Sequence, residues 1–384
     1  MHNFEFFNPT KVIFGKGTIA KLDRNVPADG KIMILYGGGS AQRNGTLDEV
    51  KKALPGRTLL EFGGIEPNPS FETLMQAVEI VRREQATFLI AVGGGSVIDG
   101  VKFVAAAAPY SGDPWGILQT YGKTVKEALP FGTVLTLPAT GSEMNNGSVI
   151  SRKEQHLKLF FQSKKVFPVF SILDPEKTYT LPKRQIANGI VDAFVHVMEQ
   201  YLTIPVGARL QDRFAESILQ TLIEVAPAAI NSHDYSNRAD FMWCATMALN
   251  GLIASGVPED WATHMIGHEI TALYGIDHAR TLAIVMPSLL NERKDAKCKK
   301  LLQYAERVWK LTEGSDEQRM DAAVAKTREF FEELGLKTHL SDYDLGLEAV
   351  DAILANLQKS GMSKLGEDGK IDPVMCRRIL EAAL

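Results

Sequence analysis

The sequence predicts two parts, an α/β domain on a parallel sheet in residues 1–182 and an all-α domain in residues 183–384. Two observations support this division. Up to about residue 180, short apolar runs alternate with amphipathic segments and glycine-rich breaks, whereas from residue 184 onward the apolar spacing is helical. No fixed repeat, low-complexity tract or long linker separates the two textures, so we expect a hinge between two packed domains near residue 180.

The first part contains short apolar runs that predict buried strands: KIMILY (31–36), FLIAVGG (88–94), GTVLTLP (132–138) and VFSILDP (169–175). The segment SFETLMQAVEIVRREQ (70–85) has the spacing of an amphipathic helix and lies between the first two runs. Buried strands that alternate with helices are typical of a parallel sheet covered on its faces by helices.

The second part has few strand-like runs. Its apolar spacing predicts helices over residues 185–202, 208–229, 238–255, 259–273, 298–311, 318–334 and 373–383. We therefore expect this half to be all-α.

Composition excludes several classes of protein. The chain is 23% charged and 45% hydrophobic, which is the balance of a folded globular protein. Its net charge of -4 gives no basic footprint, so we expect no nucleic-acid partner. The N-terminal residues lack a signal-peptide core, and longer apolar stretches are interrupted by Gly, Pro or charge, which predicts a cytoplasmic protein without a membrane partner. Cys244, Cys298 and Cys376 have no CxxC spacing and are expected to be small buried hydrophobes.

Two glycine motifs, LYGGGS (35–40) and AVGGGSVIDG (91–100), each follow a predicted strand and lead into a predicted helix. Glycine lets backbone N–H groups approach a phosphate, and a helix N-terminus adds favourable partial charge. Neither motif is G-x-G-x-x-G, and either turn alone is equally well explained as a tight connection. Because LPATGSE (137–143) follows a third strand and the carboxyl ends of parallel strands share one crevice, the three turns together favour a dinucleotide site.

The first glycine turn also indicates which dinucleotide binds. No Asp or Glu, the residue that favours the ribose of NAD, lies in the turn, whereas Ser40 and Arg43 follow it directly. A serine hydroxyl and a guanidinium suit a 2′-phosphate, so we expect NADP(H). The alternative for Arg43 is a solvated surface charge.

The segment GIVDAFVHVMEQYL (189–202) places Asp192 and His196 four residues apart, on one face of a predicted buried helix. An unpaired carboxylate among apolar side chains is costly to bury, so the sequence implies a compensating positive charge.

Three further histidines occur in THMIGHEITALYGIDHAR (263–280). His264 and His268 share a helix face, and His278 follows the break at Gly275 and can fold back toward them. Oxygen and nitrogen donors together suit Zn²⁺ or Fe²⁺. The alternative for each histidine is a core imidazole bonded to a backbone carbonyl. HMIGH is not the H-E-x-x-H pattern of zinc proteases, because Glu269 comes after the second histidine.

These motifs resemble those of the iron-containing (group III) alcohol dehydrogenases, and in particular the branch of NADPH-dependent aldehyde reductases and butanol dehydrogenases. The resemblance covers essentially the whole chain. It is carried by NPTKVIFGKG, GGIEPNP (63–69), AVGGGSVIDGVKF, LTLPATGSEMN, ANGIVDAFVHVMEQY and WATHMIGHEITALYGIDHARTLAIVMP.

The resemblance implies a Rossmann-like N-terminal domain, a helical C-terminal domain in a dehydroquinate synthase-like architecture, an active site in the cleft between them, and a homodimer. It implies one divalent ion, zinc or iron, on Asp192, His196, His264 and His278, with His268 near the substrate as the candidate catalytic residue. Implied cofactor contacts are Gly37, Gly38, Gly39, Ser40, Asn68, Gly94, Gly95, Ser96, Asp99, Thr136, Thr140, Ser142 and Lys158. Many relatives have Pro-His-Gly where this chain has Asp277-His278-Ala279.

The expected function is hydride transfer between NADP(H) and short-chain aldehydes or primary alcohols over a broad range, mainly as an aldehyde reductase. The proton would come from His268, a ribose hydroxyl or water. Three alternatives stay open: a lyase resembling dehydroquinate synthase, which needs a basic substrate pocket; a metal-dependent hydrolase; and a non-catalytic nucleotide-binding sensor.

Overall fold

The computed structural model describes residues 1–384, which divide into two compact units. The α/β unit contains Phe7–Pro182 and His233–Thr246, and the helical unit contains Met1–Phe6, Lys183–Ser232 and Met247–Leu384. Each half of the sequence therefore contributes a short segment to the unit formed mainly by the other half. A single boundary between two domains does not describe this exchange.

The α/β unit is built on a six-stranded parallel sheet with strand order β1-β8-β5-β4-β2-β3. Its strands are β1 (Lys11–Phe14), β2 (Lys31–Gly37), β3 (Thr58–Ile65), β4 (Ala86–Gly94), β5 (Phe131–Leu137) and β8 (Phe170–Leu173). The expected strands are β2, β4, β5 and β8. The edge strand β3 was not expected, because TLLEFGGI is mostly accessible and carries a glutamate and two glycines instead of a continuous apolar run.

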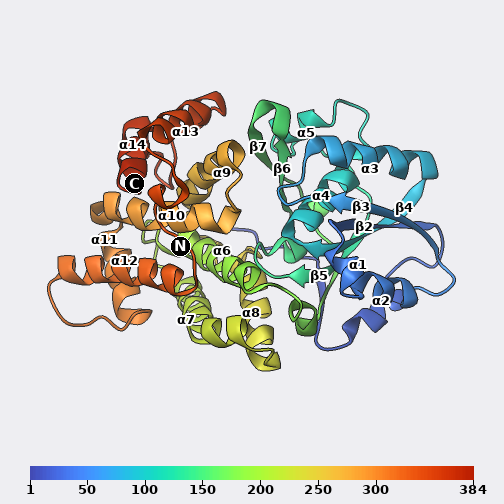
Figure 1. Cartoon of the computed structure of the whole chain (residues 1–384), viewed down its shortest axis with the longest axis horizontal. Coiled ribbons are helices and arrows are strands. Elements are labelled where there is room, and N and C mark those ends of the chain that lie inside the picture. The colour runs from blue at the N-terminus through green and yellow to red at the C-terminus, as the bar shows by residue number, and fades with distance from the viewer. The chain divides into compact units, whose positions relative to one another are not determined.

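Alternate residues of the strands enter two separate cores, one on each face of the sheet. Met33 and Leu35 pack with α3 (Phe71–Glu84) and α4 (Gly95–Ala107), whereas Ile34 packs with α2 (Thr46–Lys52). In Figure 1, α3 and α4 accordingly lie on one side of the sheet and α1 (Ser40–Arg43) and α2 on the other. The parallel α/β fold class is confirmed.

The order of the strands creates a switch point beside β2. The chain passes outward from β2 to β3 and then returns to β4 on the other side of β2. Loops that leave β2 and β4 therefore diverge, and such points are where open α/β sheets bind ligands. The unit also contains α5 (Trp115–Gln119) and an antiparallel ribbon of β6 (Gly147–Arg152) and β7 (Leu157–Gln162). Most of α8 (Tyr235–Ala248) belongs to it as well, and the last two residues of this helix fall in the residue range of the helical unit.

The helical unit contains α6 (Lys183–Tyr201), α7 (Arg209–Asn231), α9 (Ala262–Tyr274), α10 (His278–Glu292), α11 (Lys294–Arg307), α12 (Asp316–Glu333), α13 (Leu347–Lys359) and α14 (Pro373–Glu381). Helix α10 packs against α6, α9, α12 and α14 (Figure 1). Helices α10 and α13 were not expected. All residues from 281 to 290 of α10 are buried and Pro287 lies inside the helix, so this stretch shows no clear amphipathic period.

No helix combines the length and apolarity needed to cross a bilayer. All three cysteines are free thiols. Cys244 and Cys376 are buried as expected, but the expectation was wrong for Cys298, which is partly accessible.

Candidate metal centre and cofactor site

Helix α6 carries the two polar residues that raised the question of a metal site. Asp192 and His196 are 3% and 4% exposed, and their neighbours Val191 and Val195 are fully buried. Both side chains lie on the buried face because they are four residues apart on a helix. The hydrophobic packing of α6 therefore holds a carboxylate and an imidazole inside the unit.

Three imidazole nitrogens converge on one oxygen of Asp192. Asp192 Oδ1 lies 3.8 Å from His196 Nε2, 3.9 Å from His264 Nε2 and 3.6 Å from His278 Nε2. These separations are too long for hydrogen bonds. They fit ligands of one ion, because two atoms bound at about 2.1 Å in tetrahedral geometry lie about 3.4 Å apart. The donor atoms of Asp192, His196 and His264 all lie within 4.8 Å of one another.

The chemistry of this set also fits a transition metal. One carboxylate oxygen and three imidazole nitrogens are donors that Zn²⁺ and Fe²⁺ both accept. Burial lowers the pKa of His196 to about 4. The ring is therefore neutral near pH 7, which is the form that binds a metal.

His268 lies beside this cluster on α9. Its ring centroid is 5.0 Å from that of His278 and 6.2 Å from that of His264, and the residue is 6% exposed. The group of donor atoms that lie within 4.8 Å of one another contains neither His268 nor His278. His278 is included as a candidate ligand because its Nε2 atom lies 3.6 Å from Asp192 Oδ1. A catalytic role for His268 stays a prediction.

Sequence reasoning missed Glu199, which is 3% exposed and contacts His264. Its Oε2 atom contacts His264 Nδ1, and its Oε1 atom accepts the Thr263 N–H at 2.6 Å. The signal was present, because Glu199 follows Asp192 by seven residues and so lies on the same face of α6.

The Asp277-His278-Ala279 departure has a structural explanation. Asp277 Oδ2 accepts a hydrogen bond from Asn188 Nδ2 at 2.9 Å and lies 3.4 Å from Arg184 Nη1. Both partners are on α6, so the Asp277 side chain ties the start of α10 to the helix that carries Asp192.

In the α/β unit, backbone conformation and close packing account for glycine in the two predicted phosphate-binding turns. Gly39 has φ of 93°, in the left-handed region that favours glycine. A Cβ atom on Gly95 would lie 2.3 Å from Thr140 Oγ1, so no larger residue fits without displacement. Helix α4 begins after Gly94 without a side-chain cap, which leaves N–H groups of its first turn available to an anion.

Several of the predicted cofactor residues lie together at the ends of β3, β4 and β5. Ser96 Oγ accepts the Asn68 N–H at 3.4 Å, and Thr140 Oγ1 accepts the Ser142 N–H at 3.2 Å. Thr136 is 8% exposed near the end of β5. After β2, Gly38, Ser40 and Arg43 are exposed, and Arg43 Nη1 lies 3.5 Å from the Gly38 carbonyl oxygen.

Asp99 and Ser142 are held in an internal network. Asp99 accepts the Ser142 hydroxyl at 2.5 Å and the Val149 N–H at 2.9 Å. Burial raises the pKa of Asp99, while the charges of Lys102 and Lys158 lower it. Lys158 is itself 8% exposed on β7.

Sequence reasoning also missed Lys102, which is fully buried on α4. Its Nζ atom donates to Ser142 Oγ at 2.8 Å, Asn145 Oδ1 at 2.8 Å and the Gly147 carbonyl at 2.7 Å. Burial lowers its pKa to about 8. These bonds hold the segment from Ser142, a predicted cofactor residue, to the start of β6 in place.

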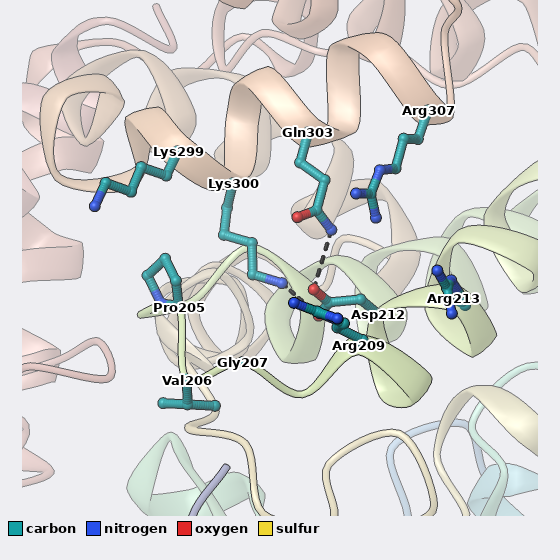
Figure 2. Close-up of a pocket in the computed structure, with 10 residues that line it drawn as sticks. All are labelled: Pro205, Val206, Gly207, Arg209, Asp212, Arg213, Lys299, Lys300, Gln303 and Arg307. Atoms are coloured by element: carbon teal, nitrogen blue, oxygen red, sulfur yellow. Dashed lines mark hydrogen bonds and ion pairs between the residues drawn. The ribbon is translucent and has the colours of Figure 1, made fainter.

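A hollow of about 550 Å³ in the helical unit gathers basic side chains. Figure 2 shows Lys300 and Gln303 of α11 reaching toward Asp212 of α7, with Arg209, Arg213, Lys299 and Arg307 around them. Neither Asp192 nor any of the histidines lines this hollow. The basic substrate pocket that a dehydroquinate synthase-like lyase would need beside the metal is therefore not supplied by this hollow.

Two protein-family models match most of the chain. Residues 9–175 match the iron-containing alcohol dehydrogenase model, and residues 186–364 match the C-terminal model of the Fe-containing alcohol dehydrogenase family. The matches together cover both units.

Individual proteins agree with these models. The NADPH-dependent aldehyde reductase YqhD of Escherichia coli K12 is 60% identical, with 100% of each chain covered. The NADP-dependent alcohol dehydrogenase 3 of Entamoeba histolytica is 40% identical over 99% of this chain and 98% of the relative. Among solved structures, E. coli K-12 YqhD superposes with a TM-score of 0.99 at 59% identity, covering 100% of this chain and 99% of that one. The structure of the NADH-dependent butanol dehydrogenase A of Thermotoga maritima superposes with a TM-score of 0.95 at 34% sequence identity, covering 100% of this chain and 99% of that one.

Proposed function

Because this chain belongs to the iron-containing alcohol dehydrogenase family, we propose that it reduces short-chain aldehydes to primary alcohols with NADPH and one divalent metal ion. The observation that carries the proposal is the convergence of three imidazole nitrogens on Asp192 Oδ1 at 3.6–3.9 Å. The name of the 60%-identical E. coli relative, an NADPH-dependent aldehyde reductase, supports the direction of the reaction. The butanol and alcohol dehydrogenases among the other relatives support the broad class of substrate. By the same family resemblance, we propose a homodimer that acts in the cytoplasm.

Asp192, His196, His264 and His278 would hold the ion, either Zn²⁺ or Fe²⁺. When bound, the ion supplies a Lewis acid that polarises the carbonyl oxygen and stabilises the negative charge that develops there. His268, which lies beside His278, would deliver a proton to the product oxygen unless a ribose hydroxyl or water does so. The surrounding residues contribute orientation and exclude water.

The cofactor would be held by the turns after β2, β4 and β5. Glycine at positions 39 and 95 lets the backbone approach the diphosphate, and the uncapped start of α4 favours its negative charge. The exposed Ser40 and Arg43 suit the 2′-phosphate of NADPH. We therefore propose a preference for NADPH over NADH.

The decisive test of function is NADPH oxidation with butanal as substrate, measured on protein as purified, after removal of metal by a chelator, and after addition of Zn²⁺ or Fe²⁺. We expect activity to disappear with the metal and to return with it. Full turnover by metal-free protein would contradict the proposal. Cleavage of an ester substrate without any NADPH oxidation would favour the hydrolase alternative.

The cofactor preference is tested separately with Arg43→Ala. Loss of one charge-assisted contact, worth about 1.5 kcal/mol, should lower kcat/KM for NADPH about tenfold and leave the value for NADH unchanged. An equal loss with both cofactors would contradict a contact between Arg43 and the 2′-phosphate.

A further inference from the structure

The start of helix α9, which carries His264, lacks the usual cap. Trp261 occupies the N-cap position with φ of 61° and makes no side-chain cap hydrogen bond. Two carboxylates accept the N–H groups that a capping side chain would otherwise bond. Asp260 Oδ1 accepts the Ala262 N–H at 2.9 Å, and Glu199 Oε1 accepts the Thr263 N–H at 2.6 Å. Negative charge at this end of a helix is favoured by the helix dipole.

The Glu199 carboxylate also contacts the metal-site histidine itself. While Oε1 accepts the Thr263 N–H, Oε2 contacts His264 Nδ1. When the Glu199 carboxylate is ionised it acts as an acceptor only, and in that form this contact places the hydrogen on Nδ1. The lone pair of His264 is then on Nε2, the atom that lies 3.9 Å from Asp192 Oδ1.

Asp260 is itself held in place by contacts with α6 and α11. The Asp260 N–H donates to the Glu199 backbone oxygen at 2.9 Å. Lys297, 3% exposed on α11, donates to Asp260 Oδ2 at 2.6 Å and to the Leu202 carbonyl at 2.6 Å. By contrast, the buried Nδ1 atom of His196 has no hydrogen-bond partner, so its ring orientation is not fixed in this way.

We propose that Glu199 is a positioning residue of the metal centre, which caps α9 and fixes His264 with its hydrogen on Nδ1 and its lone pair on Nε2. This inference rests on the proposed function, because it assumes that His264 is a metal ligand. The carboxylate is required for a simple reason. The site presents two N–H donors, from Thr263 and His264, and a glutamine offers one amide oxygen and one NH₂ group that repels the second donor.

The test is the Zn²⁺ dissociation constant of wild type and Glu199→Gln, measured by competition with a chelator. We expect about tenfold to hundredfold weaker binding in the variant, the usual effect of losing such a carboxylate–histidine contact. Added Zn²⁺ should restore activity in proportion to occupancy. The matched control is Glu216→Gln on α7, because Glu216 is also buried and accepts from Tyr201 Oη at 2.9 Å and Gln303 Nε2 at 2.7 Å. The control should bind Zn²⁺ like wild type.

A second measurement keeps the inference testable if Glu199→Gln does not fold. In the ¹⁵N spectrum of histidine-labelled wild type after removal of metal by a chelator, we expect the His264 hydrogen on Nδ1, because no ion then fixes the tautomer. A hydrogen on Nε2, or equal Zn²⁺ affinity in Glu199→Gln and wild type, would overturn the inference alone. A wild-type protein that binds neither Zn²⁺ nor Fe²⁺ would overturn the proposed function, and the inference with it.

Discussion

The two candidate binding regions of this chain are built in opposite ways. In the helical unit, side chains on α6, α9 and α10 converge, and each contributes one donor atom to the cluster; those on α6 and α9 are buried, and His278 on α10 is partly buried. In the α/β unit, the turns after β2 and β4 depend on missing side chains, on backbone conformation and on exposed polar groups. Substitutions should therefore abolish function in the first region and weaken it by degrees in the second.

The largest effect is expected from Asp192→Ala. Loss of the oxygen on which three imidazoles converge should remove the metal, and with it Lewis-acid stabilisation of about 4 kcal/mol, so kcat/KM should fall about a thousandfold. NADPH binding, followed by fluorescence, should be nearly unchanged because the cofactor turns lie in the other unit. Metal content equal to that of wild type would contradict the proposed centre.

Lys102→Met tests how much the buried charge of Lys102 and its hydrogen bonds contribute to the stability of the α/β unit. The substitution removes the donor to Ser142, Asn145 and Gly147 and leaves Lys158 as the remaining favourable charge near Asp99, so the free energy of unfolding should fall by about 3 kcal/mol at pH 7. The exposed Lys126→Met serves as the control in chemical denaturation. A change as small as that of the control would show that the Lys102 network contributes little.

The difference in unfolding free energy between wild type and Lys102→Met should also depend on pH. Burial lowers the pKa of Lys102 from 10.5 to about 8, so between these values the unfolded chain binds more protons than the folded protein. The unfolding free energy of wild type relative to Lys102→Met should rise with pH across this window, by at most about 1.4 kcal/mol per pH unit. A decrease over the window would contradict the assigned direction of the shift.

Gly95→Ala tests the backbone site without removing any polar group. The added Cβ would lie 2.3 Å from Thr140 Oγ1, and the displacement should cost about 1–3 kcal/mol, so NADPH binding should weaken by about fivefold to 150-fold. Metal affinity should not change. The control is Gly116→Ala in the same unit, where a Cβ would meet nothing within 4 Å. Equal NADPH affinity in both variants would contradict a role for the turn before α4.

The smallest effect is expected from Asp277→Ala. Asp277 is partly exposed and bonds Asn188 and Arg184, so its loss should cost about 0.5–1 kcal/mol and weaken metal binding two- to fivefold, by about that energy. Asp351→Ala, which breaks the exposed contact with Arg377, is the control. Unchanged Zn²⁺ affinity would show that Asp277 does not help to place His278.

The sequence predicted those helices and strands whose apolar and polar residues follow the pattern expected for their type of secondary structure. Strands β2, β4, β5 and β8 are continuous apolar runs, and the i,i+4 spacing of Asp192 and His196 indicated a polar face on a buried helix. Helix α10 was missed because burial on all sides removes that period, although its first residue, His278, was expected near the other histidines.

Other features were missed because they depend on tertiary contacts. Nothing local indicates that Lys102 is fully buried, since its acceptors lie 40 to 45 residues away in the chain. The contact between Glu199 and His264 spans 65 residues. The seven-residue spacing places Glu199 on the same helix face as Asp192, and the sequence shows this. The sequence does not show that Glu199 contacts His264.

The most direct test of the central claim is anomalous X-ray diffraction from crystals of the protein as purified, at the zinc and iron absorption edges. We predict one strong peak about 2.0–2.2 Å from Asp192 Oδ1 and from the Nε2 atoms of His196, His264 and His278. No peak at these atoms, or a peak bound by other residues, would contradict the account.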